Sequence, residues 1–327
     1  MGKASRTKQD SDRRARIAAQ RDAQRRTEQR RRIYLAGGSI LVIAIVAIAL
    51  VLVKLNSGSG TAAAASNGPT GSALTTLTKQ VEDVPTSVTD KVAGGGVSSS
   101  LFVPTETSTE VSNAESQIGS YFGTVNSSTA LTSGGKPEVL YMGAEYCPYC
   151  AAQRWAMVNA LSRFGTFTGL TTTHSSSTDA DPNTPTWTFY GSTYTSNYIN
   201  FTSVEETKNY RTGNTTNTSV NYVTLQTPTA AEETIGQSYD PQGSIPFIDL
   251  GNKYVQVGNL SPLSPTLLAG KTWAQVGAAM NDPSSAIGQA EIGNANYMTA
   301  GICKLTNNLP ATACTPTIQK LETTFAS

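Results

Sequence analysis

The chain is poor in residues that bind metals. Its 327 residues include one histidine, His174, and four cysteines, two of which form the sole Cys-X-X-Cys motif, Cys147 and Cys150. Protein zinc sites usually need three or four Cys, His or carboxylate ligands, so we predict no metal and no cofactor. Hydrophobic residues make up 38% of the chain, which is enough for one sizeable core but not for two large domains.

The chain also has almost no net charge, but the charges are unevenly spread. Residues 1–32 contain twelve Lys/Arg and four Asp/Glu, a net charge of about +8, and the remaining twelve bases and nineteen acids give about −7. A basic segment beside a membrane span usually sets topology and contacts anionic lipid. We therefore expect a cytoplasmic tail over 1–32 and no nucleic-acid partner.

One long hydrophobic run follows this tail. Residues 33–53 contain no charge, and about 20 apolar residues are needed to cross a bilayer as a helix. A cleavable signal peptide is the alternative, because the small residues 61–66 resemble a cleavage site. The run is longer than an ordinary signal core, and the basic tail is longer than an ordinary signal N-terminus. We predict an uncleaved transmembrane helix that leaves the rest of the chain outside the cytoplasm.

After the span, a Gly/Ala/Ser/Thr-rich segment predicts a flexible linker over 54–73. We expect a folded extracytoplasmic α/β domain over 74–327. The spacing of apolar residues predicts a short helical segment at Leu74–Val92, interrupted by Pro85.

The Cys-X-X-Cys motif lies at a predicted strand-to-helix junction. Val139–Met142 form a short apolar run that is typical of a buried strand. A helix is expected from Pro148, which suits a first helical turn, with Gly165 ending it in a left-handed conformation.

Further elements are expected along the chain. The β-branched residues of Phe167–Ser176 predict the second core strand, and a polar, aromatic-rich insertion is expected over about 176–242. A hairpin turning at Gly251 and Asn252 should follow. Two helical segments, Pro265–Met280 and Pro283–Lys304, should close the domain.

The position of the two thiols has a chemical consequence. A helix N-terminus stabilises a thiolate, so Cys147 should be the better nucleophile, and Cys150, one turn later, can resolve a mixed disulfide. The alternative is an inert disulfide, although a two-residue loop gains little stability from closure.

These segments resemble the thioredoxin superfamily. "VLYMGAEYCPYC" is similar to its strand and redox turn, and "GSIPFIDLGNKY" is similar to its later cis-proline and hairpin. The resemblance implies a thioredoxin-like fold with an insertion between the second and third core strands, a cis bond at Pro246, and a substrate contact at Ile245. Where thioredoxins carry a buried acid six residues before the first cysteine, this chain has Tyr141. Glu145 is nearer to Cys147 in sequence and is a candidate to tune the thiols.

Four segments between Val81 and Cys314 are also similar to a prokaryotic family catalogued as domain of unknown function 929. One of them is "GAEYCPYCAAQRWAMVNALSRFGTF", which contains both redox cysteines, and another is "ANYMTAGICKLTNNLPATAC". This resemblance also implies a thioredoxin-like fold, and it brings no established substrate.

The other candidate residues have structural alternatives. Cys303 and Cys314 predict a structural disulfide, or else a second redox pair that passes electrons to a membrane partner. His174 should tune the thiolate or hydrogen-bond within a loop. The insertion's aromatic residues should form either a substrate-binding wall or a small core; they are Trp187, Phe189, Tyr190, Tyr194 and Tyr198.

Taken together, the sequence predicts a membrane-anchored extracytoplasmic thiol–disulfide oxidoreductase. Its partners would be the lipid bilayer through residues 33–53, protein thiols or disulfides, and a membrane redox protein. The alternative is a non-catalytic envelope module that binds a partner and keeps both disulfides as cross-links. The large insertion favours this alternative, since it could cover the cysteines.

Overall fold

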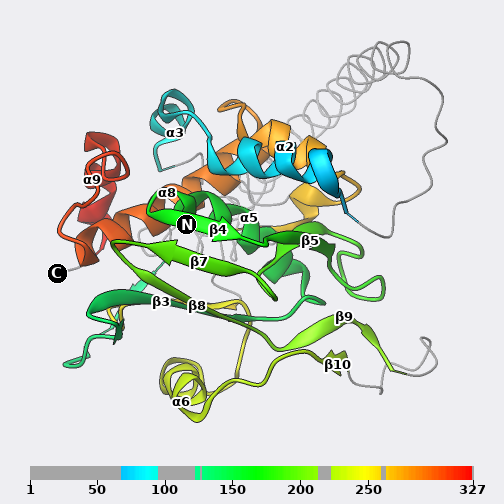
Figure 1. Ribbon diagram of the computed structural model, residues 1–327, viewed down its shortest axis with the longest axis horizontal. Helices are drawn as coiled ribbons and strands as arrows, with labels where there is room; N and C mark the ends of the chain where they lie inside the picture. Colours follow the sequence, from blue (N-terminus) through cyan, green and yellow to red (C-terminus); the bar gives the residue numbers. More distant parts are fainter. Residues whose placement is uncertain (1–67, 95–121, 126, 213–221, 259–262, 326–327) are drawn as a thin grey trace, which may run out of the picture. The chain divides into compact units, whose positions relative to one another are not determined.

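The structure is a computed structural model that describes residues 68–94, 122–125, 127–212, 222–258 and 263–325 (Figure 1). The predicted tail (1–32), the predicted span (33–53) and all but the end of the predicted linker (54–73) lie outside these ranges. Within the described ranges, no helix combines the length and the apolar character needed to cross a bilayer. Helix α2 begins at Gly71, so the linker prediction extends three residues too far.

A six-stranded mixed sheet forms the centre of the domain. Its order is β1-β12-β11-β3-β2, and β8 also pairs with β3. The six strands are β1 (Gly123–Thr124), β2 (Thr132–Ser133), β3 (Lys136–Gly143), β8 (Asn200–Glu205), β11 (Phe247–Leu250) and β12 (Tyr254–Val257). Strand β3 is central, parallel to β8 and antiparallel to β11. Its last five residues are buried, as the apolar run at Val139–Met142 predicts.

The predicted second core strand is wrong. Phe167–Ser176 contributes β4 and β5, which pair with β7 and β6 in separate two-stranded sheets. The strand beside β3 is β8, within the expected insertion. Threonine-rich segments have high strand propensity, but propensity does not select the partner strand. The insertion before β8 therefore spans β4 to β7, and a second one lies between β8 and β11.

These additions form three small antiparallel sheets. Their strands are β4 (Gly165–Thr168) with β7 (Thr193–Ser196), β5 (Thr171–His174) with β6 (Pro185–Thr188), and β9 (Thr207–Arg211) with β10 (Tyr222–Thr224). Gly165 begins β4 instead of ending the preceding helix in a left-handed conformation. A Cβ at this residue would lie 2.4 Å from the carbonyl oxygen of Thr195, so the close approach of β7 requires glycine.

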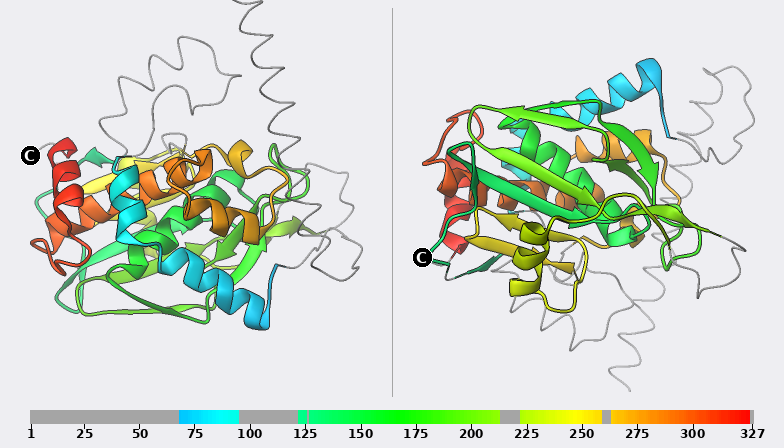
Figure 2. Two further views of the ribbon diagram at one scale, coloured as in Figure 1. Left: turned by 90° about the horizontal axis from the view of Figure 1, so that it is seen from above. Right: turned by 60° about the horizontal axis from the view of Figure 1, so that its bottom comes forward.

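Helices cover both faces of the central sheet. They are α2 (Gly71–Glu82), α3 (Thr86–Val92), α5 (Pro148–Ser162), α6 (Ala230–Tyr239), α7 (Trp273–Met280), α8 (Ala286–Leu305) and α9 (Pro316–Leu321), with 3-10 turns at Pro265–Leu268 and Glu322–Thr324. Helices α2, α5, α7 and α8 share one large apolar cluster with one face of the sheet. Helix α6 packs on the opposite face (Figure 2). Pro85 separates α2 from α3, as predicted.

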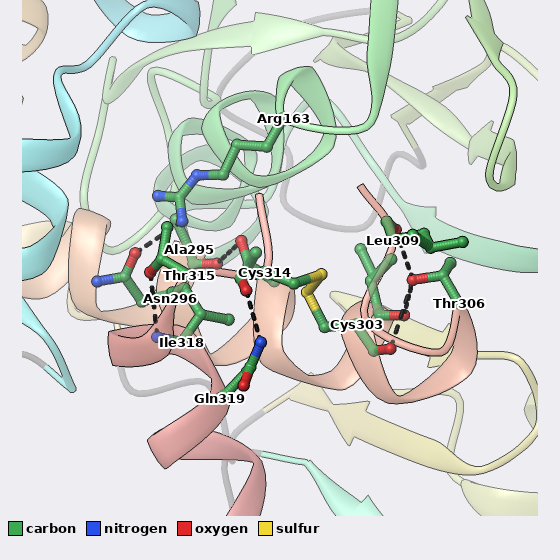
Figure 3. Close-up of a disulfide and its surroundings, with 12 residues drawn as sticks. Arg163, Ala295, Asn296, Cys303, Thr306, Leu309, Cys314, Thr315, Ile318 and Gln319 are labelled. Atoms are coloured by element: carbon green, nitrogen blue, oxygen red, sulfur yellow. Dashed lines mark hydrogen bonds between the residues drawn. A yellow bond between two sulfur atoms is a disulfide. The ribbon is translucent and has the colours of Figure 1, made fainter. Parts of the chain in front are cut away.

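The closing segments match the sequence in part. Helix α8 corresponds to the predicted segment Pro283–Lys304, whereas the predicted segment Pro265–Met280 is divided into a 3-10 turn and α7, and α9 follows α8. Strands β11 and β12 form the predicted hairpin, and both turn residues, Gly251 and Asn252, have positive φ, of 63° and 58°. Cys303, at the end of α8, is joined to Cys314 in a disulfide with a Cα–Cα distance of 5.8 Å (Figure 3). The bridge ties α8 to the segment that leads into α9, as expected for a structural cross-link.

Candidate active site

Cys147 occupies the N-cap of α5, directly after β3 and a short turn. Its sulfur accepts a hydrogen bond from the backbone N–H of Cys150 at 3.3 Å, and Pro148 takes the first helical position. The first amides of a helix have no partner within the helix, and they favour negative charge. The sulfur of Cys147 therefore lies where a thiolate is stabilised.

The two thiols differ in burial and in acidity. Both are free; Cys147 is 6% exposed and Cys150 is fully buried. A hydrogen bond from the Cys150 thiol lowers the pKa of Cys147, the Cys150 amide and the charge of Arg154 lower it further, and burial opposes them. Burial raises the pKa of Cys150 well above its usual range, and the hydrogen bond to Cys147 adds to this rise. The pair thus consists of one slightly exposed thiol with a lowered pKa and one fully buried thiol with a raised pKa.

The loop before β11 lies against the first thiol. The Ile245–Pro246 peptide bond is cis, as expected from the sequence. The Cys147 thiol donates to the carbonyl oxygen of Ile245 at 3.9 Å, across 98 residues of sequence. The structure therefore brings together Cys147, Cys150, Ile245 and Pro246.

Tyr141 lies beneath the second thiol. It is fully buried in β3, and its hydroxyl has no hydrogen-bond partner among the described residues. The hydroxyl oxygen and the Cys150 sulfur lie 2.2 and 3.1 Å from the point that a Cβ on Gly143 would occupy. Glycine at 143 therefore leaves the space that these two groups share. Burial raises the pKa of Tyr141 well above its usual range, so the phenol stays a hydrogen-bond donor.

A buried ion pair completes the site. Arg154, on α5, donates from Nε and Nη2 to the carboxylate of Glu205, at 2.8 and 2.5 Å. Nη2 also donates to the carbonyl oxygen of Ala144 at 2.8 Å. Both side chains are fully buried, and the guanidinium lies 5.8 Å from the ring centre of Tyr141. The ion pair thus fixes the end of β8 and the turn after β3 to the helix that carries the thiols.

The sequence interpretation missed this pair. One signal was present: Arg154 lies four residues after Cys150, on the same side of the helix, in a segment otherwise free of charge up to Arg163. Every residue of α5 except Tyr149 and Ser162 is buried. A buried charge needs a partner, but nothing in the sequence identifies Glu205, because β8 was not recognised as a core strand.

Of the two predicted tuning residues, Glu145 lies near the buried ion pair. It is half-buried, and burial raises its pKa. A hydrogen bond from Thr188 and the charge of Arg154 oppose this rise. His174 ends β5, where its Nδ1 lies 2.8 Å from the carbonyl oxygen of Ser175. Arg154 is the cation that lowers the pKa of Cys147.

Aromatic residues of the insertion belong mainly to the core. Trp187 and Phe189 are buried, and Tyr194 and Tyr198 pack against the same cluster. Only Tyr190 of the five is largely exposed. The small-core alternative therefore accounts for four of them.

A different aromatic stack lies beside the Cys-X-X-Cys turn. The ring of Tyr146 stacks on Tyr222 with centroids 4.1 Å apart. Arg211 lies over the same Tyr222 ring at 4.3 Å. The β9–β10 hairpin is thereby held against the residue that precedes Cys147. In the described part of the chain, no three His, Cys, Asp or Glu side chains are grouped to hold a metal ion.

The comparisons with known proteins give one result. Residues 124–304 match the model of the family described as Domain of unknown function (DUF929). The chain belongs to this family. The DUF929 match covers Cys147 and Cys150, the Arg154–Glu205 pair and Pro246, and it ends before Cys314. No curated protein and no solved structure matches the chain.

Proposed function

We propose that this DUF929 protein is a thiol–disulfide oxidoreductase with a thioredoxin-like domain. The observation that carries the proposal is the position of Cys147, which caps α5 and faces the Ile245 carbonyl next to a cis-proline. An inert structural disulfide requires neither a lowered pKa on one thiol nor a raised pKa on the other. A reactive pair requires this difference.

The order of elements supports the thioredoxin-like fold. A buried strand, β3, leads through the Cys-X-X-Cys turn into α5, and a parallel strand, β8, follows. The cis-proline then precedes the antiparallel β11–β12 hairpin, and α8 packs on α5. This order is the one that the resemblance implies, with β8 in place of the strand that we expected.

The proposed reaction is a two-step exchange. The Cys147 thiolate attacks a disulfide sulfur of a partner protein; one S–S bond breaks, a mixed disulfide forms, and the partner's leaving thiolate takes up a proton. Cys150 then loses its proton and attacks Cys147, so the partner leaves as a dithiol and the pair is oxidised. Run in reverse with a dithiol partner, the same steps oxidise the partner.

Buried groups beside Cys150 serve the second step. The raised pKa of Cys150 keeps it protonated until the mixed disulfide forms. The charge of Arg154 and the hydroxyl of Tyr141 are positioned to stabilise the thiolate that must then appear. Tyr141 occupies the position at which thioredoxins have an acid. In this proposal it therefore acts as a hydrogen-bond donor and not as a base.

The sequence supplies the proposed location. Residues 33–53 would anchor the protein in the cell membrane, with the basic tail in the cytoplasm and the redox domain outside. Its partners would be secreted or envelope proteins with thiols or disulfides, and a membrane redox protein that returns the Cys147–Cys150 pair to its starting redox state.

One observation favours a second function. Cys147 is only 6% exposed, and a protein that serves as a binding scaffold has no need of an accessible sulfur. In that alternative the domain binds an envelope partner, and Cys147 and Cys150 stay joined in a disulfide.

A trapping experiment separates the two. In the full chain with Cys150→Ser, a mixed disulfide through Cys147 cannot be resolved, so partners should accumulate as covalent complexes that reductant releases. The Cys147→Ser/Cys150→Ser chain is the matched control and should trap nothing. Equal recovery from both variants, together with a wild-type Cys147–Cys150 bond that resists mild reductant, would favour the scaffold.

A further inference from the structure

A cavity of about 290 Å³ lies beside the cis-proline loop, on the face of the sheet that α6 covers. Its floor is apolar: Met142 of β3 and Phe247 of β11 lie opposite each other in the sheet and both line it. Ile245, which accepts the hydrogen bond from the Cys147 thiol, also lines it. The cavity therefore adjoins the candidate active site at Ile245.

Two acidic side chains line the cavity and have no hydrogen-bond or ion-pair partner among the residues that the structure describes. Glu206 follows β8 and is fixed by its backbone N–H, which donates to the carbonyl oxygen of Gly143 at 2.7 Å. Glu233 lies in the first turn of α6. Burial and the charge of Glu233 raise the pKa of Glu206, so the two carboxylates repel each other. Asp240 differs, because its carboxylate accepts from the backbone N–H groups of Gln242 and Ser244.

We propose that this cavity binds the side chain of a lysine or arginine in the polypeptide that reacts with Cys147. Such a side chain has an aliphatic stem that fits an apolar floor and a cation that fits an acidic rim. The volume lies at the lower limit of small-molecule pockets, which suits one side chain. A cation between Glu206 and Glu233 would also relieve their repulsion. This inference rests on the proposed function, since it names the substrate class of the same site.

The first test measures exchange with the reduced full chain. The probes are short peptides, each with one cysteine held as a mixed disulfide with a chromogenic aryl thiol. Cys147 attacks the peptide sulfur, the aryl thiolate leaves, and its absorbance gives the rate. Lysine, norleucine or glutamate stands one or two residues from the cysteine. At the best position we expect lysine to react about fivefold faster than norleucine, and glutamate more slowly.

The variant Glu206→Gln/Glu233→Gln should bring the lysine-to-norleucine ratio close to one. The matched control is Asp83→Asn, which removes an exposed acid at the C-terminal end of α2, outside the cavity lining, and should keep the ratio. Added salt should reduce the preference in the wild type, because the contact is electrostatic. The ratio is internal to each variant, so a general loss of activity does not imitate the result.

A second test needs no redox chemistry. In the Cys147→Ser chain, peptides with serine in place of cysteine are titrated by fluorescence anisotropy, with and without the two glutamine substitutions. Tighter binding of the lysine peptide that disappears with Glu206→Gln/Glu233→Gln supports the subsite, even if no exchange occurs and the proposed function fails. Exchange without a lysine preference, or a preference that survives the substitutions, overturns the subsite and leaves the proposed function standing.

Discussion

Arg154 and Glu205 form a fully buried, two-point ion pair that joins α5, the helix capped by Cys147, to the end of β8. The positive charge of Arg154 acts on both sulfurs. It lowers the pKa of Cys147, and it partly offsets the rise that burial causes in the pKa of Cys150. Structural integrity and thiol chemistry therefore depend on the same two residues. Separating these roles requires one variant that breaks the pair and another that neutralises it.

Breaking the pair should destabilise the domain strongly. Arg154→Met leaves the Glu205 carboxylate buried without its cation, a situation that costs about 3–5 kcal/mol. Denaturant titration of the full chain measures this loss. In the wild type the backbone N–H of Phe189 donates to Glu205. Arg154→Met/Glu205→Gln removes both charges and still offers this N–H an acceptor oxygen. The double variant should recover most of the stability.

The same double variant isolates the effect on the thiol. With the domain folded and Arg154 absent, the pKa of Cys147 should rise, so less thiolate exists at pH 7 and alkylation by iodoacetamide slows. The pH profile of alkylation of the double variant measures this. An unchanged profile in a folded double variant would show that Arg154 has only a structural role.

Tyr141→Phe should separate resolution from attack. The hydroxyl has no partner among the described residues, so its loss should leave stability unchanged or raise it by up to about 1 kcal/mol. A hydrogen bond to a forming thiolate is worth more, and its loss should slow the attack of Cys150 on a mixed disulfide about tenfold. Stopped-flow measurement of both steps checks this. Equal slowing of the first step, or none of the second, would contradict this role for Tyr141.

Asp249 should make the stability of the domain depend on pH. Its side chain is buried at the start of the hairpin turn, where Oδ1 accepts from the backbone N–H of Asn252 and Oδ2 has no partner in the described chain. Burial raises its pKa to about 7. Between about pH 4 and pH 7 the folded state holds a proton that the unfolded chain releases, so stability should fall as pH rises, by at most about 1.4 kcal/mol per pH unit. Denaturant titrations across this range should show a shallower slope for Asp249→Asn.

The Cys303–Cys314 bridge should matter for stability alone. It joins two cysteines that are 11 positions apart in the sequence, and Cys303→Ser/Cys314→Ser should cost on the order of 3 kcal/mol. The rate at which Cys147 reacts with a small disulfide should stay the same in the folded variant. A lost exchange rate would instead support the second-redox-pair alternative for these cysteines.

Local patterns predicted the parts of the site that are set by local geometry. The position of Cys147 at a helix start follows from an apolar run and a proline, and the Gly251–Asn252 turn follows from residues that tolerate positive φ. The cis bond at Pro246 was predicted from the family resemblance. Each of these features involves a few neighbouring residues.

Tertiary pairing decided the rest. Strand β8 has a polar sequence with only two buried residues, so its pattern did not distinguish it from the threonine-rich strands nearby. Once β8 is placed beside β3, register puts Glu205 opposite Gly143 and within reach of Arg154. The acidic cavity has the same origin, because Glu206 and Glu233 are brought together only by the packing of α6 on the sheet.

The most direct test of the central claim is the redox equilibrium of the Cys147–Cys150 pair in the full chain. The protein is equilibrated in glutathione buffers, free thiols are alkylated, and mass spectrometry counts them at each cysteine. The account predicts a reversible two-electron transition between about −270 and −120 mV, the range of Cys-X-X-Cys oxidoreductases, with Cys303 and Cys314 unmodified throughout. A pair that stays fully oxidised or fully reduced across this range would contradict it.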